Sequence, residues 1–522
     1  RDTIRNLSGS VVKGDAIRLK FSSDNDFYWE NCLINVFALK YPRRFNFQNN
    51  GFAEFSLSAS NNGRFLKLGG FRSDNQTTIL YDLTNLKRYT AAPKADSSFF
   101  AIDASGSERK IVISNSVSFL RQVTTLIKRN FTPVTNNQGD YLIITNAVLK
   151  PTSGTDNVEE YRKYRSSPEG GNYAAKVFDI DDLAEQFSYG LRKHPLAIRN
   201  FIRFSQNSLS VKPKYLFLVG KGTNFEALRV TGDFAGKELI GAVPTFGTPC
   251  SDNLLVAKNN SDPTPTIPIG RLSAISNDEI GIYLQKVKQL ELLVGKANRT
   301  PQEIAWSKRF VHLVGSSGDD YEKNTFTRAF IMPYSDLVRK SAYNLAFTID
   351  TLPYTFDPRY FPNEMSKLQN VLDSGIGVLS FFGHSSTSSV DFGLKPPSQY
   401  PPSNGKYFIA VANGCRAGNV FEFNTNRIRS ASTSISDSYI FVPERGAINF
   451  ISNSDIGALR FMYNVTEKWY NEYLNNGSGK TIGQIQQATI RSSIDSYPGE
   501  KRIASQCEQA ILSGDPAIRP SP

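Results

Sequence analysis

From residue 140 onwards, short apolar runs of strand length alternate with segments that carry a helical pattern of apolar residues. The first cycles predict strands at 140–145, 174–180 and 214–220, and helices at 158–165, 182–189 and 196–204. A chain that alternates strands and helices in this way buries both faces of a parallel sheet beneath helices. The succession therefore predicts an α/β fold with a largely parallel sheet flanked by helices.

A second series of alternating elements follows a long predicted helix at 277–293 and a polar, proline-containing stretch at 295–307. Its predicted strands are 310–315, 344–352, 377–384, 407–415 and 447–452. Its predicted helices are 325–341, 364–372, 456–474 and 481–494. The polar stretch is a plausible join, so we expect two subdomains, A over 138–299 and B over 300–522.

The first part of the chain, residues 1–137, follows a different pattern. Alternating and aromatic-rich runs are separated by turn-forming Ser, Asn, Asp and Gly residues. The predicted strands are 16–21, 33–39, 52–57, 78–82 and 110–114. Regularly spaced short strands are typical of a sandwich or jelly roll. We therefore expect an all-β sandwich-like domain to precede the α/β part.

Composition limits the function classes that need to be considered. The net charge is +12, but the basic residues are scattered, which indicates a solvated basic surface and no nucleic-acid partner. The four Cys and three His are too dispersed for a zinc site or a disulfide framework. No apolar run reaches the about 20 residues that cross a membrane. The chain opens on Arg-Asp-Thr, and we expect a processed or interior piece of a longer protein.

His384 and Cys415 stand out because each closes an apolar, strand-like run. If the two strands are neighbours in a parallel sheet, both side chains emerge at its carboxyl edge, where open α/β sheets place their active sites. A thiol becomes a strong nucleophile as the thiolate, and a neighbouring imidazole can take its proton at neutral pH. The pair therefore predicts a cysteine nucleophile, Cys415, with His384 as its general base.

Small residues surround this pair. Gly383 precedes His384, Ser385 follows it, and Gly414 precedes Cys415. We expect tight turns that let backbone N–H groups at Gly383, Ser385 and Gly414 approach a substrate carbonyl and stabilise an oxyanion. Each residue alone also has an ordinary structural interpretation, because an isolated Cys is most often a small buried hydrophobic residue.

The sequences around the pair, 380–384 and 408–415, resemble the signature of the gingipain-type cysteine peptidases, a family of the caspase-like clan. The resemblance spans about residues 139–520. It continues through segments 140–146, 186–190, 197–199, 215–220, 268–272 and 513–519. Within the family, segments 167–172 and 192–201 most resemble the sortases of the type IX secretion system.

The resemblance implies a caspase-like peptidase domain and a place on the bacterial cell surface, at the outer face of the outer membrane. It implies cleavage of the C-terminal secretion signal from cargo proteins through a Cys415 thioester, and transfer of the cargo to an amine acceptor such as anionic lipopolysaccharide. The implied partners are cargo proteins with C-terminal secretion domains, an outer-membrane β-barrel carrier and the lipopolysaccharide acceptor.

Two departures from the family pattern bear on the mechanism. Relatives often read Gly-His-Gly, whereas Ser385 follows the histidine here. The family's histidine-orienting glutamate falls near Ser317, where no carboxylate stands. His384 and Cys415 then act as a dyad, or Asp319 or Asp320 supplies the orienting or specificity-determining carboxylate. We expect no required cofactor and no metal in the site, although relatives bind calcium and Asp252 is a candidate ligand for it.

Two alternatives remain open at the level of sequence. The protein could be a secreted gingipain-type endopeptidase that only hydrolyses its substrates. It could also be a non-catalytic docking scaffold built on the peptidase fold. The intact Cys415 and His384 favour an enzyme over the scaffold.

Overall fold

The computed structural model describes residues 41–94, 97–115, 128, 131–135, 138–224, 227–228, 236–259, 262–315, 320–341, 351–355, 362–390, 396–423, 427 and 434–520. The chain divides into two compact units, Arg1–Arg129 and Asn130–Pro522. The strands predicted at 16–21 and 33–39 lie outside the described residues.

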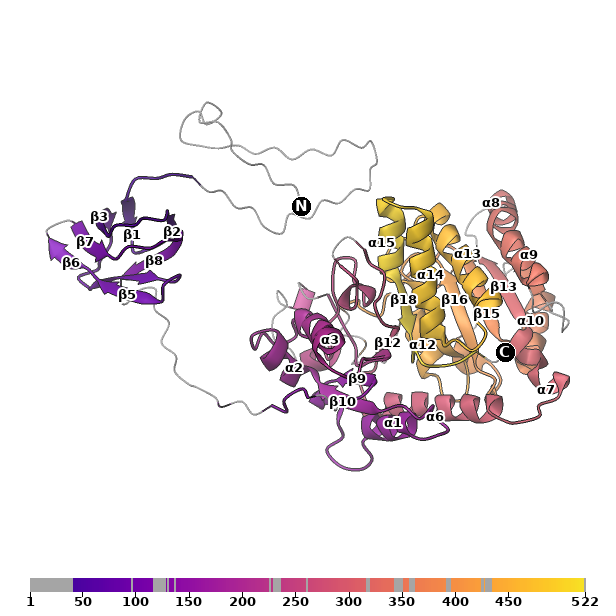
Figure 1. Cartoon of the computed structure of the whole chain (residues 1–522). Coiled ribbons are helices and arrows are strands. Elements are labelled where there is room, and N and C mark those ends of the chain that lie inside the picture. The colour runs from indigo at the N-terminus through magenta and orange to yellow at the C-terminus, as the bar shows by residue number, and fades with distance from the viewer. Residues whose placement is uncertain are drawn as a thin grey trace. The chain divides into compact units, whose positions relative to one another are not determined.

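The N-terminal unit is a β-sandwich (Figure 1). Its strands are β1 Asn46–Asn50, β2 Phe52–Leu57, β3 Arg64–Phe71, β4 Thr78–Asp82, β5 Lys87–Thr90, β6 Ala92–Lys94, β7 Ser97–Ile102 and β8 Arg109–Asn115. They form two sheets in the orders β1-β3-β7-β6 and β2-β8-β4-β5. Alternate side chains of each sheet, including Leu68, Phe100, Ile111 and Ile113, fill a shared core. The predicted all-β sandwich is confirmed.

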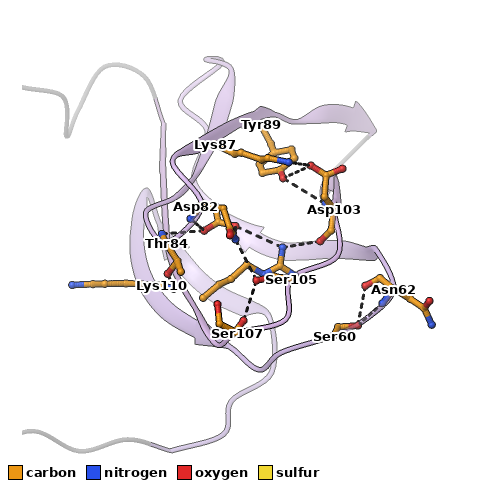
Figure 2. Close-up of polar contacts among 12 residues, drawn as sticks. Ser60, Asn62, Asp82, Thr84, Lys87, Tyr89, Asp103, Ser105, Ser107 and Lys110 are labelled. Carbon is orange, nitrogen blue, oxygen red and sulfur yellow. Dashed lines mark hydrogen bonds and ion pairs between the residues drawn. The ribbon is translucent and has the colours of Figure 1, made fainter.

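Asp82 and Arg109 form a buried ion pair in this sandwich. Figure 2 shows the polar contacts around Asp82 and Asp103. Asp82 accepts the backbone N–H groups of Thr84 and Asn85, at 3.1 and 3.0 Å, which forms the turn after β4. The Arg109 guanidinium donates to the Asp103 carbonyl at 2.8 Å and lies 3.6 Å from the Asp82 carboxylate. Both side chains are almost fully buried, so this pair fixes the turn that joins β4 to β5.

The second unit is built on one large sheet of the order β10-β9-β11-β12-β18-β17-β16-β15-β13-β14. Its strands are β9 Tyr141–Thr145, β10 Ala175–Asp179, β11 Tyr215–Val219, β12 Ile269–Leu272, β13 Phe310–Gly315, β14 Thr351–Thr355, β15 Val378–Gly383, β16 Phe408–Asn413, β17 Ala447–Asn453 and β18 Ala510–Ser513. All pairings are parallel except that of β17 with β18. The predicted, largely parallel sheet is confirmed, and most of the strand expected at 344–352 lies outside the described residues.

Helices cover both faces of this sheet (Figure 1). They are α1 Asn157–Ser166, α2 Ile180–Phe187, α3 Leu196–Ser208, α5 Lys237–Ile240, α6 Asn277–Val294, α7 Pro301–Ala305, α8 Asp320–Phe326, α9 Met332–Lys340, α10 Pro362–Ser374, α12 Ile435–Phe441, α13 Leu459–Asn475, α14 Ile482–Ser496 and α15 Lys501–Gln509. Along β9, Tyr141 and Ile143 belong to the core beneath α1 and α6, whereas Leu142 and Ile144 face α2 and α3. This two-sided burial explains why the strand sequences are continuously apolar.

Strand β18 joins the two halves of the sheet. It pairs in parallel with β12 through Arg271 and Ser513, and antiparallel with β17. The sequence did not predict this strand or helix α15 before it. Among the helices that the structure describes, none has both the length and the apolar character needed to span a lipid bilayer.

Candidate active site

His384 and Cys415 follow neighbouring strands at the carboxyl edge of the sheet. Strand β15 pairs in parallel with β16, and the last matched residues of the two strands are Phe382 and Asn413. His384 and Cys415 each stand two residues beyond that matched pair. The sequence predicted both strands, with ends one and two residues beyond the observed ones, and the sheet brings the two residues to the same edge.

The turns beyond β15 and β16 approach each other closely. The Ser385 hydroxyl donates to the Cys415 carbonyl at 2.8 Å, which ties the histidine turn to the cysteine turn. A Cβ atom on Gly414 would collide with Ser385 Oγ, and one on Gly383 would collide with the Gly315 carbonyl. Both glycines are therefore required by the close packing of three chain segments. Ser385, the departure from the family pattern, fastens this packing through its side chain.

Glu322 supplies a carboxylate to His384. Its Oε1 lies 2.8 Å from His384 Nε2, and the two side chains are 31% and 49% exposed. A carboxylate only accepts hydrogen bonds, so Nε2 carries the proton and the lone pair of the neutral ring lies on Nδ1. The Phe326 ring, one turn further along α8, packs 5.7 Å from the imidazole centroid. The His384 ring is therefore positioned by a hydrogen bond to Glu322 and by packing against the Phe326 ring.

This acid was missed in the sequence. Asp319 lies outside the described residues, and Asp320 begins helix α8, while its side chain is not described. The available signal was the acidic start of the segment after β13, where Glu322 stands in the first turn of α8. The orienting carboxylate that the structure provides is Glu322, so His384 and Cys415 are not confined to a dyad.

The loop between β17 and α13 lies beside the thiol. The Gly457 carbonyl is 3.8 Å from Cys415 Sγ. Ile456 and Leu459, on either side of Gly457, are 59% and 42% exposed. The Asp455 carboxylate in the same loop accepts from Arg416 Nε at 2.9 Å. The loop whose backbone contacts the thiol therefore carries two exposed apolar residues and a carboxylate that is paired with an arginine.

The remaining titratable candidates have structural surroundings. Burial raises the pKa of the Cys250 and Cys507 thiols to about 12, so neither ionises readily. His312 is fully buried, with its ring nitrogens 3.0 Å from Ser335 Oγ and 2.8 Å from Tyr470 Oη. His194 Nδ1 accepts the Leu196 N–H at the start of α3. Cys32 lies outside the described residues.

Asp252 does not fit the calcium role that the family resemblance suggested for it. Its two oxygens each accept from the Arg271 guanidinium at 2.7 Å, and the Thr245 hydroxyl donates to one of them at 2.9 Å. A guanidinium in that position repels a cation. Within the described ranges, no group of three or more His, Cys, Asp or Glu side chains is placed to hold a metal ion.

Comparison with known structures agrees with this architecture. The crystal structure of the Arg-specific cysteine proteinase gingipain R (RgpB) superposes with a TM-score of 0.52 at 15% identity, over 74% of this chain and 80% of that one. The complex of Porphyromonas gingivalis RgpB pro- and mature domains gives 0.52 at 15% identity, over 73% and 79%. Dimeric latent PorU from the same organism gives 0.41 at 11% identity, over 88% and 38%. The likeness to RgpB shows that the fold is caspase-like.

The sequence comparison identifies the family of the chain more firmly than these superpositions do. Among curated proteins, none is similar enough in sequence to be matched to this chain. Residues 134–521, however, match the family profile described as peptidase family C25. This match covers the whole of the large sheet and its helices, including both strand ends that carry His384 and Cys415. The chain belongs to peptidase family C25, the gingipain family of cysteine peptidases.

Proposed function

We propose that the protein is a cell-surface sortase that cleaves the C-terminal secretion signal from type IX secretion cargo and passes the cargo to an amine acceptor. The observation that carries the proposal is the grouping of Cys415, His384 and Glu322 at the carboxyl edge of a family C25 sheet. The sequence of segments 167–172 and 192–201 supports the sortase branch over a plain peptidase.

In the proposed reaction, His384 Nδ1 takes the Cys415 proton, because Nε2 is already committed to Glu322. The thiolate then attacks the scissile carbonyl carbon and forms a C–S bond. The N–H groups at Gly383, Ser385 and Gly414, together with that of Cys415, are the proposed donors to the oxyanion. The C–N bond breaks as the imidazolium returns the proton to the leaving amine, which leaves a thioester.

The second half of the reaction decides between a sortase and a peptidase. An acceptor amine attacks the thioester carbonyl, His384 Nδ1 takes its proton, and the C–S bond breaks to restore the Cys415 thiol. The product is a new amide, for which anionic lipopolysaccharide is the proposed acceptor. Water in place of the amine gives simple hydrolysis. An outer-membrane β-barrel carrier is the proposed partner that holds the enzyme at the cell surface.

The decisive experiment replaces the nucleophile. Cys415→Ala is expected to abolish cargo trimming and attachment in cells while leaving the thermal melting curve unchanged, because the hydrogen bond described for the half-buried thiol, to the Gly457 carbonyl, is long at 3.8 Å. Cys507→Ala is the matched control, since its thiol is fully buried, burial raises its pKa to about 12, and it packs away from this loop; it is expected to remain active. Normal trimming and attachment of cargo by Cys415→Ala would rule out every catalytic version of the proposal.

The products distinguish transfer from hydrolysis. Purified enzyme is incubated with a cargo-derived peptide and an excess of a primary amine, and the products are weighed by mass spectrometry. The sortase is expected to yield the amide adduct. Hydrolysed product alone favours the endopeptidase, and unreacted peptide from an enzyme that is also inert in cells favours the scaffold.

We further propose that the substrate residue before the scissile bond is small or apolar and not basic. Ile456 and Leu459 are exposed and lie next to or near Gly457, whose carbonyl contacts the thiol, and the one described carboxylate in their loop, Asp455, is paired with Arg416. A basic side chain placed there would lose water without gaining a free carboxylate.

This preference is tested by Ile456→Asp. The replacement is expected to lower kcat/KM about 10-fold for peptides with an apolar residue at that position and to raise it for peptides with Lys or Arg. Leu292→Asp, the same kind of change at an exposed position on α6, serves as the control and is expected to alter neither value. A wild-type enzyme that already cleaves after Arg or Lys in preference to apolar residues contradicts the proposal.

A further inference from the structure

The segment that carries the nucleophile is anchored on the sheet side along its first half. We call Gly414–Phe421 the thiol loop. Ser385 Oγ donates to the Cys415 carbonyl, the Arg416 N–H donates to the Asp455 carbonyl at 3.0 Å, and the Gly418 N–H donates to the Asn453 carbonyl at 2.9 Å. These contacts come from neighbouring strands of the same half of the unit. They do not involve the far end of the loop, at Val420 and Phe421.

The far end of the thiol loop is held by the other half of the sheet. Lys221 Nζ donates to the Val420 carbonyl, and Thr223 Oγ1 donates to the Phe421 carbonyl at 2.9 Å. Lys221 and Thr223 lie just beyond β11, about two hundred residues earlier in the chain. All four residues are buried. Two consecutive carbonyls of the loop thus accept hydrogen bonds from two side chains of one short segment.

The segment that provides this grip is itself fixed. The Lys221 N–H donates to the Ala274 carbonyl at 2.9 Å, beyond β12, and the Lys221 carbonyl accepts the Val243 N–H at 3.0 Å. The backbone of Lys221 is therefore held between two other segments. Because the Lys221 backbone is fixed, its side chain can hold the Val420 carbonyl at a defined position in addition to donating a hydrogen bond to it.

Lysine is a costly choice at this position. The Lys221 side chain belongs to a residue that is only 4% exposed. Among the described residues, no carboxylate lies within ion-pair distance of its ammonium group, whose acceptor is a backbone carbonyl. Burying an ammonium group without an ion-pair partner is unfavourable, whereas a threonine suffices for the neighbouring carbonyl. A charged donor makes a stronger hydrogen bond to the Val420 carbonyl than a neutral donor would, and this bond offsets part of the cost of burial.

We propose that Lys221 and Thr223 form a clamp that positions the thiol loop, and with it Cys415, for attack. The proposal rests on the nucleophilic role proposed above for Cys415. Both residues act through the loop backbone and contact no substrate, so they are positioning residues. The clamp makes the geometry of the nucleophile beyond β16 depend on the segment that follows β11, in the other half of the sheet.

The charged surroundings of Lys221 make the clamp sensitive to pH. Burial lowers the pKa of Lys221 to about 8, with Arg427 and Arg271 acting in the same direction and Asp437 and Glu422 opposing it. The ammonium form, which makes the stronger hydrogen bond, is present below that pKa. As the pH rises through about 8, the native lysine becomes neutral and its grip on Val420 weakens.

Hydrogen–deuterium exchange on the full chain tests the clamp directly. Lys221→Met is expected to speed exchange in peptides covering 414–423 by about 10- to 100-fold, because a charged donor is lost. Thr223→Val, a change that preserves shape, is expected to act in the same direction with a smaller effect. It carries the test if Lys221→Met does not fold. In both variants kcat is expected to fall while KM stays within a few-fold of wild type.

Lys286 offers a matched control. It is another buried lysine whose Nζ donates to backbone carbonyls, those of Tyr439 and Ile440, at 3.0 and 2.9 Å. Neither acceptor belongs to the thiol loop. Lys286→Met is therefore expected to lower the melting temperature without speeding exchange at 414–423. Equal acceleration at 414–423 in Lys286→Met and Lys221→Met would mean that the effect is general loosening, and would overturn the clamp.

The pH dependence supplies the remaining test. After correction for intrinsic exchange, wild-type protection at 414–423 is expected to fall between pH 7 and pH 9, whereas Lys221→Arg, which stays charged, keeps it. Unchanged protection in Lys221→Met and Thr223→Val overturns the clamp even if the enzyme is active. If Cys415→Ala retains full activity, the proposed function fails, while the exchange data still decide whether the clamp exists.

Discussion

At the scale of single residues, the candidate site includes an acid that lies outside the two strand ends. Cys415 and His384 could be found in the sequence because an apolar strand gives each a recognisable position. Glu322 has no such marker, since one glutamate in an acidic helical turn resembles many solvent-exposed ones. Its role becomes visible only through the 2.8 Å contact with His384 Nε2.

Glu322→Gln is expected to lower kcat by about 100-fold or more, because an amide can donate to Nε2 and thereby favour the wrong tautomer of His384. KM is expected to change little, since Glu322 faces the imidazole. The measurement is steady-state hydrolysis of a cargo-derived peptide. Asp320→Asn removes a charge two residues earlier in α8 and is expected to retain activity within a few-fold. A larger loss of activity in Asp320→Asn than in Glu322→Gln would show that Asp320, and not Glu322, orients His384.

Lys221 was missed for a different reason. A lysine that follows an apolar strand predicts a solvent-exposed end of the strand, and nothing in the local sequence reports the Val420 carbonyl that covers it. Contacts between residues about two hundred positions apart are set by the topology of the sheet. They become predictable only once the order of the strands is known.

At the scale of elements, the helices beside the site depart from a simple reading of periodicity. The apolar pattern predicted one helix over 325–341. The structure has α8, a π-helical turn at Thr327–Ile331, and then α9, in which Pro333 lies in the first turn. Proline lacks the N–H that would continue the helical ladder, so a wider turn before it is a natural solution. Through this arrangement Glu322 on α8 and Ser335 on α9 reach different positions along the sheet.

His312 connects three elements and makes the unit sensitive to acid. It lies on β13 and bonds Ser335 on α9 and Tyr470 on α13, and burial lowers its pKa to about 3. The imidazole stays neutral in the folded protein, whereas the unfolded chain takes up a proton below about pH 6.5. The unfolded state binds more protons than the folded state between pH 6.5 and pH 3. The contribution of His312 to the free energy of unfolding is therefore fully present above pH 6.5 and is lost as the pH falls towards 3.

The predicted contribution of His312 is a loss of about 3 kcal/mol in the free energy of unfolding between pH 7 and pH 4. Urea titrations at the two pH values measure the loss. His312→Gln keeps two hydrogen-bonding groups but does not titrate, so its loss over the same range is expected to be smaller by that amount. Equal losses in the two proteins would show that His312 is protonated in the native state.

At the scale of the whole molecule, the sequence predicted an all-β part followed by an α/β part, and it predicted the parallel character of the sheet. Strand periodicity and the change from alternating strands to strand–helix cycles carried that information. The joining of the two halves through β18 was not predicted, because Ala510–Ser513 is four residues long and pairs with β12, far away in sequence. Its antiparallel pairing with β17 also departs from the parallel pairing of the other strands in the sheet.

The late position of β18 has a consequence for how the protein is made. Of the described strands of the sheet, it is the last to leave the ribosome, after the segments that carry Glu322, His384 and Cys415. Before then, β12 and β17 have no strand between them, and Asn453 lacks the Gln506 side chain that holds it beside Gly414. A nascent chain thus carries its complete set of reactive groups for some time without the support that positions them. We therefore expect peptidase activity to appear only after β18 has been made and has paired with β12 and β17.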